Sequence, residues 1–426
     1  MSAPSSDPDF PDTSPSLPRI AWMTVAMLAP VALLNYLDRQ MLAAMKTSMM
    51  ADIPDIASRE NWGFMLGSFK WVYAVLSPIG GYIADRYSRR LVIVSSLFVW
   101  SAVTWVTGYV TTYDGLVATR ALMGISEAFY IPAALALITD FHRGSTRSRA
   151  VGIHQTGIYA GLILGGFAGH VADAPDLGWR FAFQACGLVG VVYAIPLLLV
   201  LRDPPVRESE REHRGASMGS ALGELARNRD FLLLVIYFTL PAMAGWVVKD
   251  WMPDILKERF GLTQGNAGVY AVLPVQIASL VGVVFGGWMA DMGMRRSDRG
   301  RIFVSAVGMI LFLPALFGVG LSEHLGLAVA FLILYGIGWG FFDCNNMPIL
   351  SQIVPPDRRA TGYGVMNLVS ISCGGFADWG FGALRDRHMP LSVIFGVFAL
   401  IALVSVAVVL AIRPKPELTA NAQQKE

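Results

Sequence analysis

Residues Gly81–Arg90 read GYIADRYSRR and lie between two long apolar runs. A second copy, GWMADMGMRR, spans Gly287–Arg296, 206 residues further along the chain and again at the end of an apolar run. A shorter match pairs RAVG at Arg149–Gly152 with RATG at Arg359–Gly362. Repetition at a nearly constant offset indicates that the chain contains two copies of one structural unit.

The composition is that of a membrane protein. Of 426 residues, 54% are hydrophobic and 15% are charged, whereas soluble chains are about 25% charged. The net charge of +2 provides no basic surface for a nucleic acid. The three cysteines form no CxxC pair, so we expect neither a disulfide framework nor a metal cluster.

Twelve apolar runs are long enough to cross the bilayer. A spanning helix needs about 20 residues, and continuous rather than alternating apolar runs favour helices over a barrel. The predicted spans are Arg19–Met45, Trp62–Ala84, Leu91–Val110, Leu116–Thr139, Ala150–Ala172, Phe181–Leu201, Phe231–Leu256, Ala267–Ala290, Ile302–Leu321, Leu325–Ile353, Thr361–Leu384 and Leu391–Ile412.

Loop charges predict the orientation of these spans. Most of the 33 Lys and Arg residues lie in the intervals on the side of both termini, which places both termini in the cytoplasm and the chain in the plasma or inner membrane. The longest hydrophilic interval divides the spans into six and six. The predicted regions are a disordered tail at 1–18, a first bundle at 19–201, a cytoplasmic linker at 202–230, a second bundle at 231–412 and a tail at 413–426.

The repeated loop motif, Gly81-x3-Asp85-Arg86-x2-Arg89-Arg90, together with the six-plus-six layout, resembles the major facilitator superfamily. That resemblance implies an all-α membrane protein of two pseudo-symmetric six-helix bundles, a monomer that works by alternating access. It also implies a cytoplasmic gate made by the residues of the motif and its copy: Gly81, Asp85, Arg86, Arg89, Arg90, Asp291 and Arg295. Ser88 and Met292 depart from the usual motif, and these arginines also fit a purely topological role.

Charged residues inside the spans are the strongest candidates for function, because burying a charge in the membrane is costly. Asp38 and Arg39 lie in the first span, and Arg120 and Glu127 lie in the fourth. Seven residues are about two helical turns, so Arg120 and Glu127 share a helix face. We predict that Asp38 and Glu127 carry the coupling proton. The alternative is a set of structural ion pairs, Asp38 with either arginine and Glu127 with Arg120.

The same residues resemble the anion:cation symporter branch of the superfamily, which includes sugar-acid and sialin-like carriers. They are Asn35-Tyr36-x-Asp38-Arg39, Ser68-Phe69-x-Trp71-x-Tyr73 and Arg120-x6-Glu127. The resemblance implies that the substrate path is lined by Tyr36, Arg39, Tyr73, Arg120, Gln155 and Asn367. Spinster-like lipid carriers share the first and third patterns, so that branch stays open.

Three further residues are substrate-site candidates. Lys70 and Lys249 lie within spans, where they would join Arg39 and Arg120 in a field that favours an anion. For Lys249 the alternatives are pairing with Asp250 or snorkelling to the interface. Asn346 belongs to a polar run at membrane depth.

These observations predict a secondary transporter that couples protons to a small organic anion, such as a sugar acid. We expect no cofactor, no enzymatic activity, and no partner besides substrate, protons and membrane lipids, because the chain has no phosphate-binding loop, catalytic triad or metal-ligand spacing. The alternatives are a Spinster-like carrier of lipids or amphipathic amines and a neutral sugar facilitator.

Overall fold

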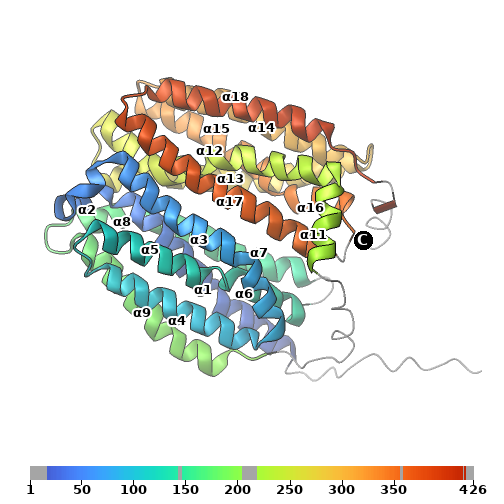
Figure 1. The fold of residues 1–426 in the computed structure, drawn as a ribbon, viewed down its shortest axis with the longest axis horizontal. Coiled ribbons are helices and arrows are strands. Elements are labelled where there is room, and N and C mark those ends of the chain that lie inside the picture. Colours follow the sequence, from blue (N-terminus) through green and yellow to red (C-terminus); the bar gives the residue numbers. More distant parts are fainter. Residues whose placement is uncertain (1–16, 143–145, 204–217, 356–357, 416, 419–426) are drawn as a thin grey trace, which may run out of the picture.

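The computed structural model describes residues 17–142, 146–203, 218–355, 358–415 and 417–418. The surroundings of Gly81 and the side chain of Asp85 are outside this description. The described residues form a bundle of helices that run roughly parallel to its long axis (Figure 1).

The first half of the chain contains α1 (Leu17–Ala44), α2 (Lys46–Asp52), a 3-10 turn η1 (Pro54–Ala57), α3 (Arg59–Arg86), α4 (Arg89–Thr107), α5 (Tyr113–Glu127), α6 (Tyr130–Phe141), α7 (Arg147–Gly166), α8 (Ala168–Asp173) and α9 (Gly178–Val200). The second half contains α11 (Met218–Arg227), α12 (Arg229–Phe260), α13 (Gln264–Met294), α14 (Gly300–Leu321), α15 (Leu325–Asp343), α16 (Asn346–Ile353), α17 (Arg359–Asp386) and α18 (Leu391–Ala411).

Nine helical segments in the described part of the chain are long and apolar enough to span a membrane. The helices α3, α7 and α17 are not among them, although they have 28, 20 and 28 residues. Glycines and polar residues dilute their apolar content, because these helices face the other half or the interior rather than lipid alone. The prediction of twelve spans and of the side on which the termini lie therefore stays a prediction.

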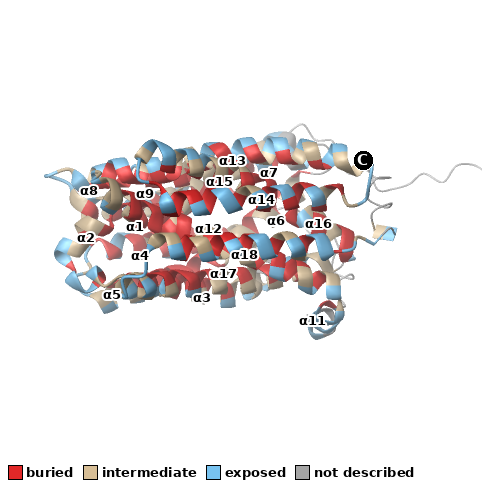
Figure 2. Cartoon of the chain, turned by 90° about the horizontal axis from the view of Figure 1, so that it is seen from above, coloured by how far each residue is buried: buried red, intermediate tan, exposed pale blue. Residues whose placement is uncertain are grey.

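The two halves lie side by side, with α3 and α17 along their border (Figure 1). We call the end of the bundle that carries α2 and α8 the α2 end, and the end that carries α11 and α16 the α11 end. In Figure 2 the buried residues concentrate on inward faces, and exposed residues follow the outer faces. Large apolar side chains such as Leu199 (75% exposed) and Val284 (65% exposed) lie on the outside, as expected for contact with lipid.

Glycines allow a close approach of α3 and α17. A Cβ atom on Gly63 would lie 2.3 Å from the backbone oxygen of Asp378, and one on Gly382 would lie 2.1 Å from the backbone oxygen of Arg59. On Gly67 it would lie 2.9 Å from the backbone oxygen of Gly375. Small residues at such an interface let two backbones pack directly. We call this contact the glycine seam.

Candidate functional site

A cavity of about 330 Å³ lies between the two halves. The helices α1, α3, α6 and α7 contribute its walls from the first half, and α12, α13, α15 and α17 from the second. Its polar lining consists of Tyr36, Arg39, Gln40, Tyr73, Gln155, Tyr159, Lys249, Gln276, Ser279, Tyr335, Asp343, Tyr363, Asn367 and Ser370. Its other aromatic residues are Phe238, Trp246, Trp339 and Phe342.

Arg39 connects the cavity to a buried carboxylate. Its Nε donates to Oε2 of Glu127 at 2.5 Å. The guanidinium carbon lies 5.0 Å from the ring centre of Tyr36 and 5.0 Å from that of Tyr73. One Nη nitrogen of Arg39 and one oxygen of Glu127 are buried without a hydrogen-bond partner. Buried polar atoms normally have partners, so this nitrogen and this oxygen can each form a further hydrogen bond.

Asp38 and Arg120 lie next to this pair, away from the cavity lining. Asp38 is 1% exposed and accepts a hydrogen bond from the hydroxyl of Thr104. Arg120 is 3% exposed, its Nη1 lies 3.2 Å from the sulfur of Met123, and it stacks on the Phe69 ring. The sequence had left open a Glu127–Arg120 pair, but among the described residues the ion-pair partner of Glu127 is Arg39.

The two unusual lysines occupy different places. Lys249 lines the cavity, and its ammonium lies 5.4 Å from the ring centre of Tyr36 and 5.0 Å from that of Trp246. Lys70 lies outside the cavity lining and forms ion pairs with Asp250, at 2.5 Å, and Asp378. The expectation that Lys70 faces the cavity is corrected by this position, since two carboxylates hold the ammonium at the border of the halves.

Of the other predicted substrate residues, Tyr36, Tyr73, Gln155 and Asn367 line the cavity. Arg120 and Asn346 do not. Asn346 is 3% exposed and both polar atoms of its amide are buried without a partner. It begins α16, just after the break that follows Asp343.

Asp343, which belongs to the polar run at membrane depth that includes Asn346, is a carboxylate in the cavity lining. It is the last residue of α15, as Glu127 is the last residue of α5, and each precedes a break within a long helical segment. The two carboxylates therefore occupy matching places in the two halves. This match agrees with internal symmetry, which places sites at discontinuous helices.

The predicted gate residues make contacts within their own half. Arg89 pairs with Asp140 and donates to the backbone oxygen of Ala136, while Arg90 donates through Nε to the backbone oxygen of Leu198 at 3.1 Å. Arg86 lies over the Tyr82 ring, and Asp291 lies 3.9 Å from Arg301. Arg295 is exposed. The surroundings of Gly81 and the side chain of Asp85 are not described, so the predicted gate between the halves stays a prediction.

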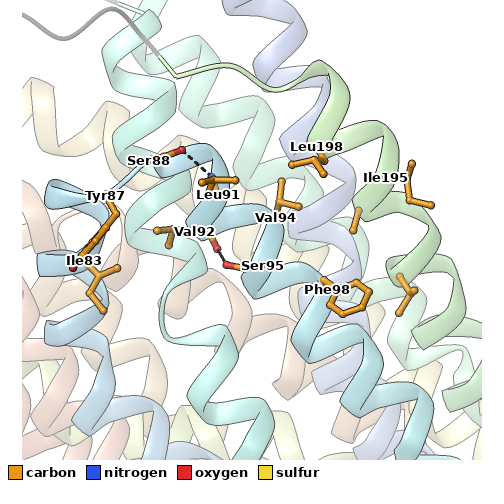
Figure 3. A pocket seen from close by; sticks show the side chains of 12 residues that line it. Ile83, Tyr87, Ser88, Leu91, Val92, Val94, Ser95, Phe98, Ile195 and Leu198 are labelled. Atoms are coloured by element: carbon orange, nitrogen blue, oxygen red, sulfur yellow. Dashed lines mark hydrogen bonds between the residues drawn. The ribbon is translucent and has the colours of Figure 1, made fainter.

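A second hollow lies on the outer surface between α3, α4 and α9 (Figure 3). Its volume is about 670 Å³, and its lining is almost entirely apolar, including Leu91, Phe98 and Ile195. The hydroxyls shown there, Ser88 and Ser95, bond to the backbone of α4 itself (Figure 3). This groove fits lipid chains, so the smaller, polar cavity between the halves is the candidate site.

Polar contacts join the halves at the α2 end. Lys46 binds Asp254 at 2.6 Å, and Arg59 binds Glu258 at 2.7 Å. The carboxylate of Asp386 accepts hydrogen bonds from the backbone N–H groups of Arg59 and Glu60, at 3.1 and 2.9 Å. Burial raises the pKa of Asp386, but these hydrogen bonds outweigh it and hold that pKa below its usual value.

A model of the Major Facilitator Superfamily matches residues 28–377, most of the helical core just described. The chain belongs to the Major Facilitator Superfamily. It is therefore an integral membrane transporter and not an enzyme.

The similar curated proteins in this superfamily include Spinster proteins. Protein spinster of Drosophila melanogaster is 28% identical over 382 residues, which cover 85% of this chain and 62% of that protein. Protein spinster homolog 1 of Homo sapiens is 29% identical over 417 residues, covering 89% and 77%. An MFS-type efflux pump of Mycolicibacterium smegmatis is 28% identical over 397 residues, covering 91% and 89%.

Two solved structures share the superfamily fold. A bacterial homolog of the human lysosomal transporter Spinster, inward-facing and unoccupied, gives a TM-score of 0.73 at 19% identity, covering 95% of this chain and 97% of that one. A D-xylose-proton symporter gives 0.70 at 18% identity, covering 93% and 98%. The match of the superfamily model confirms the predicted superfamily, and the named relatives include Spinster proteins, the second of the two branches that the motifs resemble.

Proposed function

We propose that this chain is a proton-coupled symporter of a small organic anion, with the anion bound at Arg39 and Lys249 and the proton carried by Glu127 and Asp38. The observation that carries the proposal is the buried Arg39–Glu127 ion pair at the wall of the central cavity. It connects the residue best suited to bind an anion directly to a carboxylate that can take up a proton.

The lining favours an anion with an apolar or ring-shaped body. Among the described lining residues the basic ones are Arg39 and Lys249, and both lie against the ring of Tyr36. An arginine can hold a carboxylate through two parallel hydrogen bonds, and the aromatic rings of Trp246 and Trp339 offer flat contact surfaces. A sugar acid combines these two requirements.

Coupling follows from competition for Arg39. While Glu127 is ionised it occupies the guanidinium, and an arriving anion must share that charge. When Glu127 takes up a proton, Arg39 loses its charged partner and becomes available to the anion. Asp38 is buried beside Arg120. In its ionised form it offsets the charge of that arginine, and it is the second carboxylate that can take up a proton. Substrate and proton binding therefore favour each other.

The charge distribution predicts that the end with most basic loops is cytoplasmic and that the α2 end lies on the outer side. Closure at the α2 end therefore supports an inward-facing state. Ion pairs and the glycine seam join the halves at the α2 end. In this proposal the α2 end faces outwards, and Arg86, Arg89, Arg90 and Arg295 lie on the cytoplasmic side.

A second candidate is a carrier of lipids or amphipathic amines, as the Spinster relatives suggest. The observation that favours it is Asp343, an exposed carboxylate among the aromatic rings of the cavity. A carboxylate with aromatic neighbours suits an ammonium group. The same cavity without proton coupling would suit a neutral sugar.

The test is a transport screen in proteoliposomes. Uronic, aldonic and dicarboxylic acids, neutral sugars and lysolipids are offered with and without an inward proton gradient, and charge movement and uptake are recorded. We expect uphill uptake of an acid only with the gradient, and Glu127→Gln should bind and exchange that acid without concentrating it. The matched control is Glu323→Gln, an exposed loop carboxylate. Gradient-independent uptake, or uptake of lysolipids alone, contradicts the proposal in favour of the second candidate.

A further inference from the structure

Three charged side chains from both halves meet at the border between them. The ammonium of Lys70 on α3 binds Asp250 on α12 at 2.5 Å and Asp378 on α17. The side chains are 3%, 7% and 0% exposed, respectively. The ammonium also lies 4.3 Å from the ring centre of Trp246, and the ammonium of the cavity residue Lys249 lies 5.0 Å from the same ring centre.

The charges within this cluster do not balance. The single ammonium of Lys70 pairs with both carboxylates. If all three side chains are ionised, the cluster carries one negative charge in excess. One oxygen of Asp378 is also buried without a hydrogen-bond partner. Two carboxylates that share a site cannot both ionise at low cost, and a single bound proton removes the excess charge. By this count of charges, one proton bound by the pair of aspartates makes the three-residue cluster neutral.

Other charged groups around the cluster are already engaged. On α12, Lys249 faces the cavity, while Asp254 pairs with Lys46 of α2 and Glu258 with Arg59 of α3. Glu60 of α3 accepts a hydrogen bond from Trp379 at 3.2 Å. Arg120 of α5 lies with Asp38 and Glu127 on the side of the first half. Lys249 and Arg120 are further cations that act electrostatically on Asp250, but among the described residues neither forms an ion pair with Asp250 or Asp378.

The cluster must come apart when the α2 end opens. Lys70 belongs to the first half and both aspartates to the second, so separating the halves removes the ammonium from the carboxylates and brings water to all three groups. In water both carboxylates ionise above about pH 4 to 5. The closed state therefore holds one proton that the open state releases.

We propose that Lys70, Asp250 and Asp378 form a proton-binding latch, in which closure of the α2 end takes up one proton from the medium on that side. This proton is separate from the coupling proton assigned to Asp38 and Glu127, because it enters and leaves on the same side. Acid on that side holds the transporter closed there, and alkali favours opening.

The test measures the distance between spin labels placed across the α2 end, with Cys186, Cys344 and Cys373 replaced, in nanodiscs. To remove the coupling protons from the measurement, the background carries Glu127→Gln and Asp38→Asn. Raising the pH from about 5.5 to 8.5 should raise the ratio of open to closed molecules by up to about tenfold per pH unit, as one released proton requires. A ratio that does not change with pH in this background overturns the proposal.

Variants assign that proton to the latch. Asp378→Asn and Asp250→Asn each leave one carboxylate on Lys70, so either should abolish the pH dependence, whereas Glu323→Gln should keep it. Lys70→Met removes the cation, so closure should take up two protons and the ratio should change by up to about a hundredfold per pH unit.

Retained pH dependence in both aspartate variants contradicts the latch. If neither aspartate variant folds, the test is the pH dependence of the open-to-closed ratio in Lys70→Met. A dependence equal to that of the background contradicts the latch. Because transport plays no part in the readout, failure here is distinct from failure of the proposed symport.

Discussion

At the scale of single residues, Arg39 lies between two environments. One side of its guanidinium contacts aromatic rings at the cavity wall, and its Nε binds Glu127, which is 0% exposed on its side chain. An ion pair this deeply buried contributes little net stability, yet losing one partner is costly. We therefore interpret Arg39 as a cation whose partner can change from Glu127 to a substrate anion, and not as a residue that stabilises the fold.

Replacing Arg39 tests this role. Arg39→Lys keeps the charge but loses the planar two-bond geometry, so we expect affinity for an acidic substrate to fall about 10- to 100-fold, as the loss of charged hydrogen bonds worth about 1.5–3 kcal/mol implies. Calorimetry on the purified protein measures it. Arg180→Lys, at a site that pairs with the partly exposed Asp52, is the matched control. Unchanged affinity in Arg39→Lys would falsify the assignment of the anion site.

Asp38→Asn should act on stability as well as coupling. Removing this buried charge weakens the electrostatic compensation of Arg120, which is 3% exposed, and we expect a loss of about 1–3 kcal/mol, as for a buried polar group left without its partner. Thermal unfolding in detergent reports it. Adding Arg120→Met should recover part of the loss, and no recovery means that Asp38 stabilises the fold through Thr104 instead.

At the scale of elements, α3 and α17 approach each other backbone to backbone at the glycine seam, while side chains such as Trp71 and Phe376 pack beside it. The seam has a simple test in Gly63→Ala, whose Cβ would lie 2.3 Å from the backbone oxygen of Asp378. The helices must then separate, at a cost of about 1–3 kcal/mol typical of overpacking. Thermal unfolding should show a lower Tm. Gly380→Ala on α17 meets nothing within 4 Å, so it should leave Tm unchanged or raise it.

The N-terminus of α3 is capped from the other half by Asp386, which predicts a pH dependence. A carboxylate whose pKa is lowered in the native state stabilises at pH values above its usual pKa, and this contribution disappears as the pH falls through the native value. The contact should therefore be complete above the usual value of 3.8 and be lost below it.

Asp386→Asn should reproduce the effect of acid at neutral pH by weakening closure of the α2 end. Single-molecule fluorescence energy transfer between labels on α2 and α13 measures the closed fraction. Asp55→Asn is the control, because Asp55 contacts Asn61 through its backbone oxygen. Equal closed fractions in both variants contradict the capping role.

At the scale of the whole molecule, ion pairs between the halves concentrate at the α2 end, and reversing one tests closure. Lys46→Asp places two carboxylates where Lys46 binds Asp254 at 2.6 Å, so we expect spin-label distances across that end to lengthen. Combining it with Asp254→Lys should restore them. The ammonium of Lys46 also lies near the rings of Trp62 and Trp251. If the double variant is as open as the single one, packing against these rings, and not the charge pair, determines closure.

The sequence predicted the superfamily and the repeat, because apolar length, internal repetition and motif spacing are local properties of the chain. Six of the nine predicted substrate residues also line the cavity. It did not predict the partners of the charged residues. Arg39 meets Glu127 across 88 residues, and Lys70 meets Asp378 across 308. Such contacts depend on how helices rotate and pack against each other, and helical spacing within one span carries no information about that. Lys70 was therefore expected in the cavity, although it lies between the halves.

The glycine seam also bears on how fast the transporter works. Where side chains interlock, two helices must repack many rotamers before they part, and friction is spread along their length. At Gly63, Gly67 and Gly382 each helix meets backbone of the other, so at these three points few rotamers must repack before the helices separate. The kinetic barrier to opening should then reside in a few discrete polar contacts at the α2 end. Turnover would accordingly respond sharply to single charge changes there and hardly at all to the size of apolar residues on the lipid face.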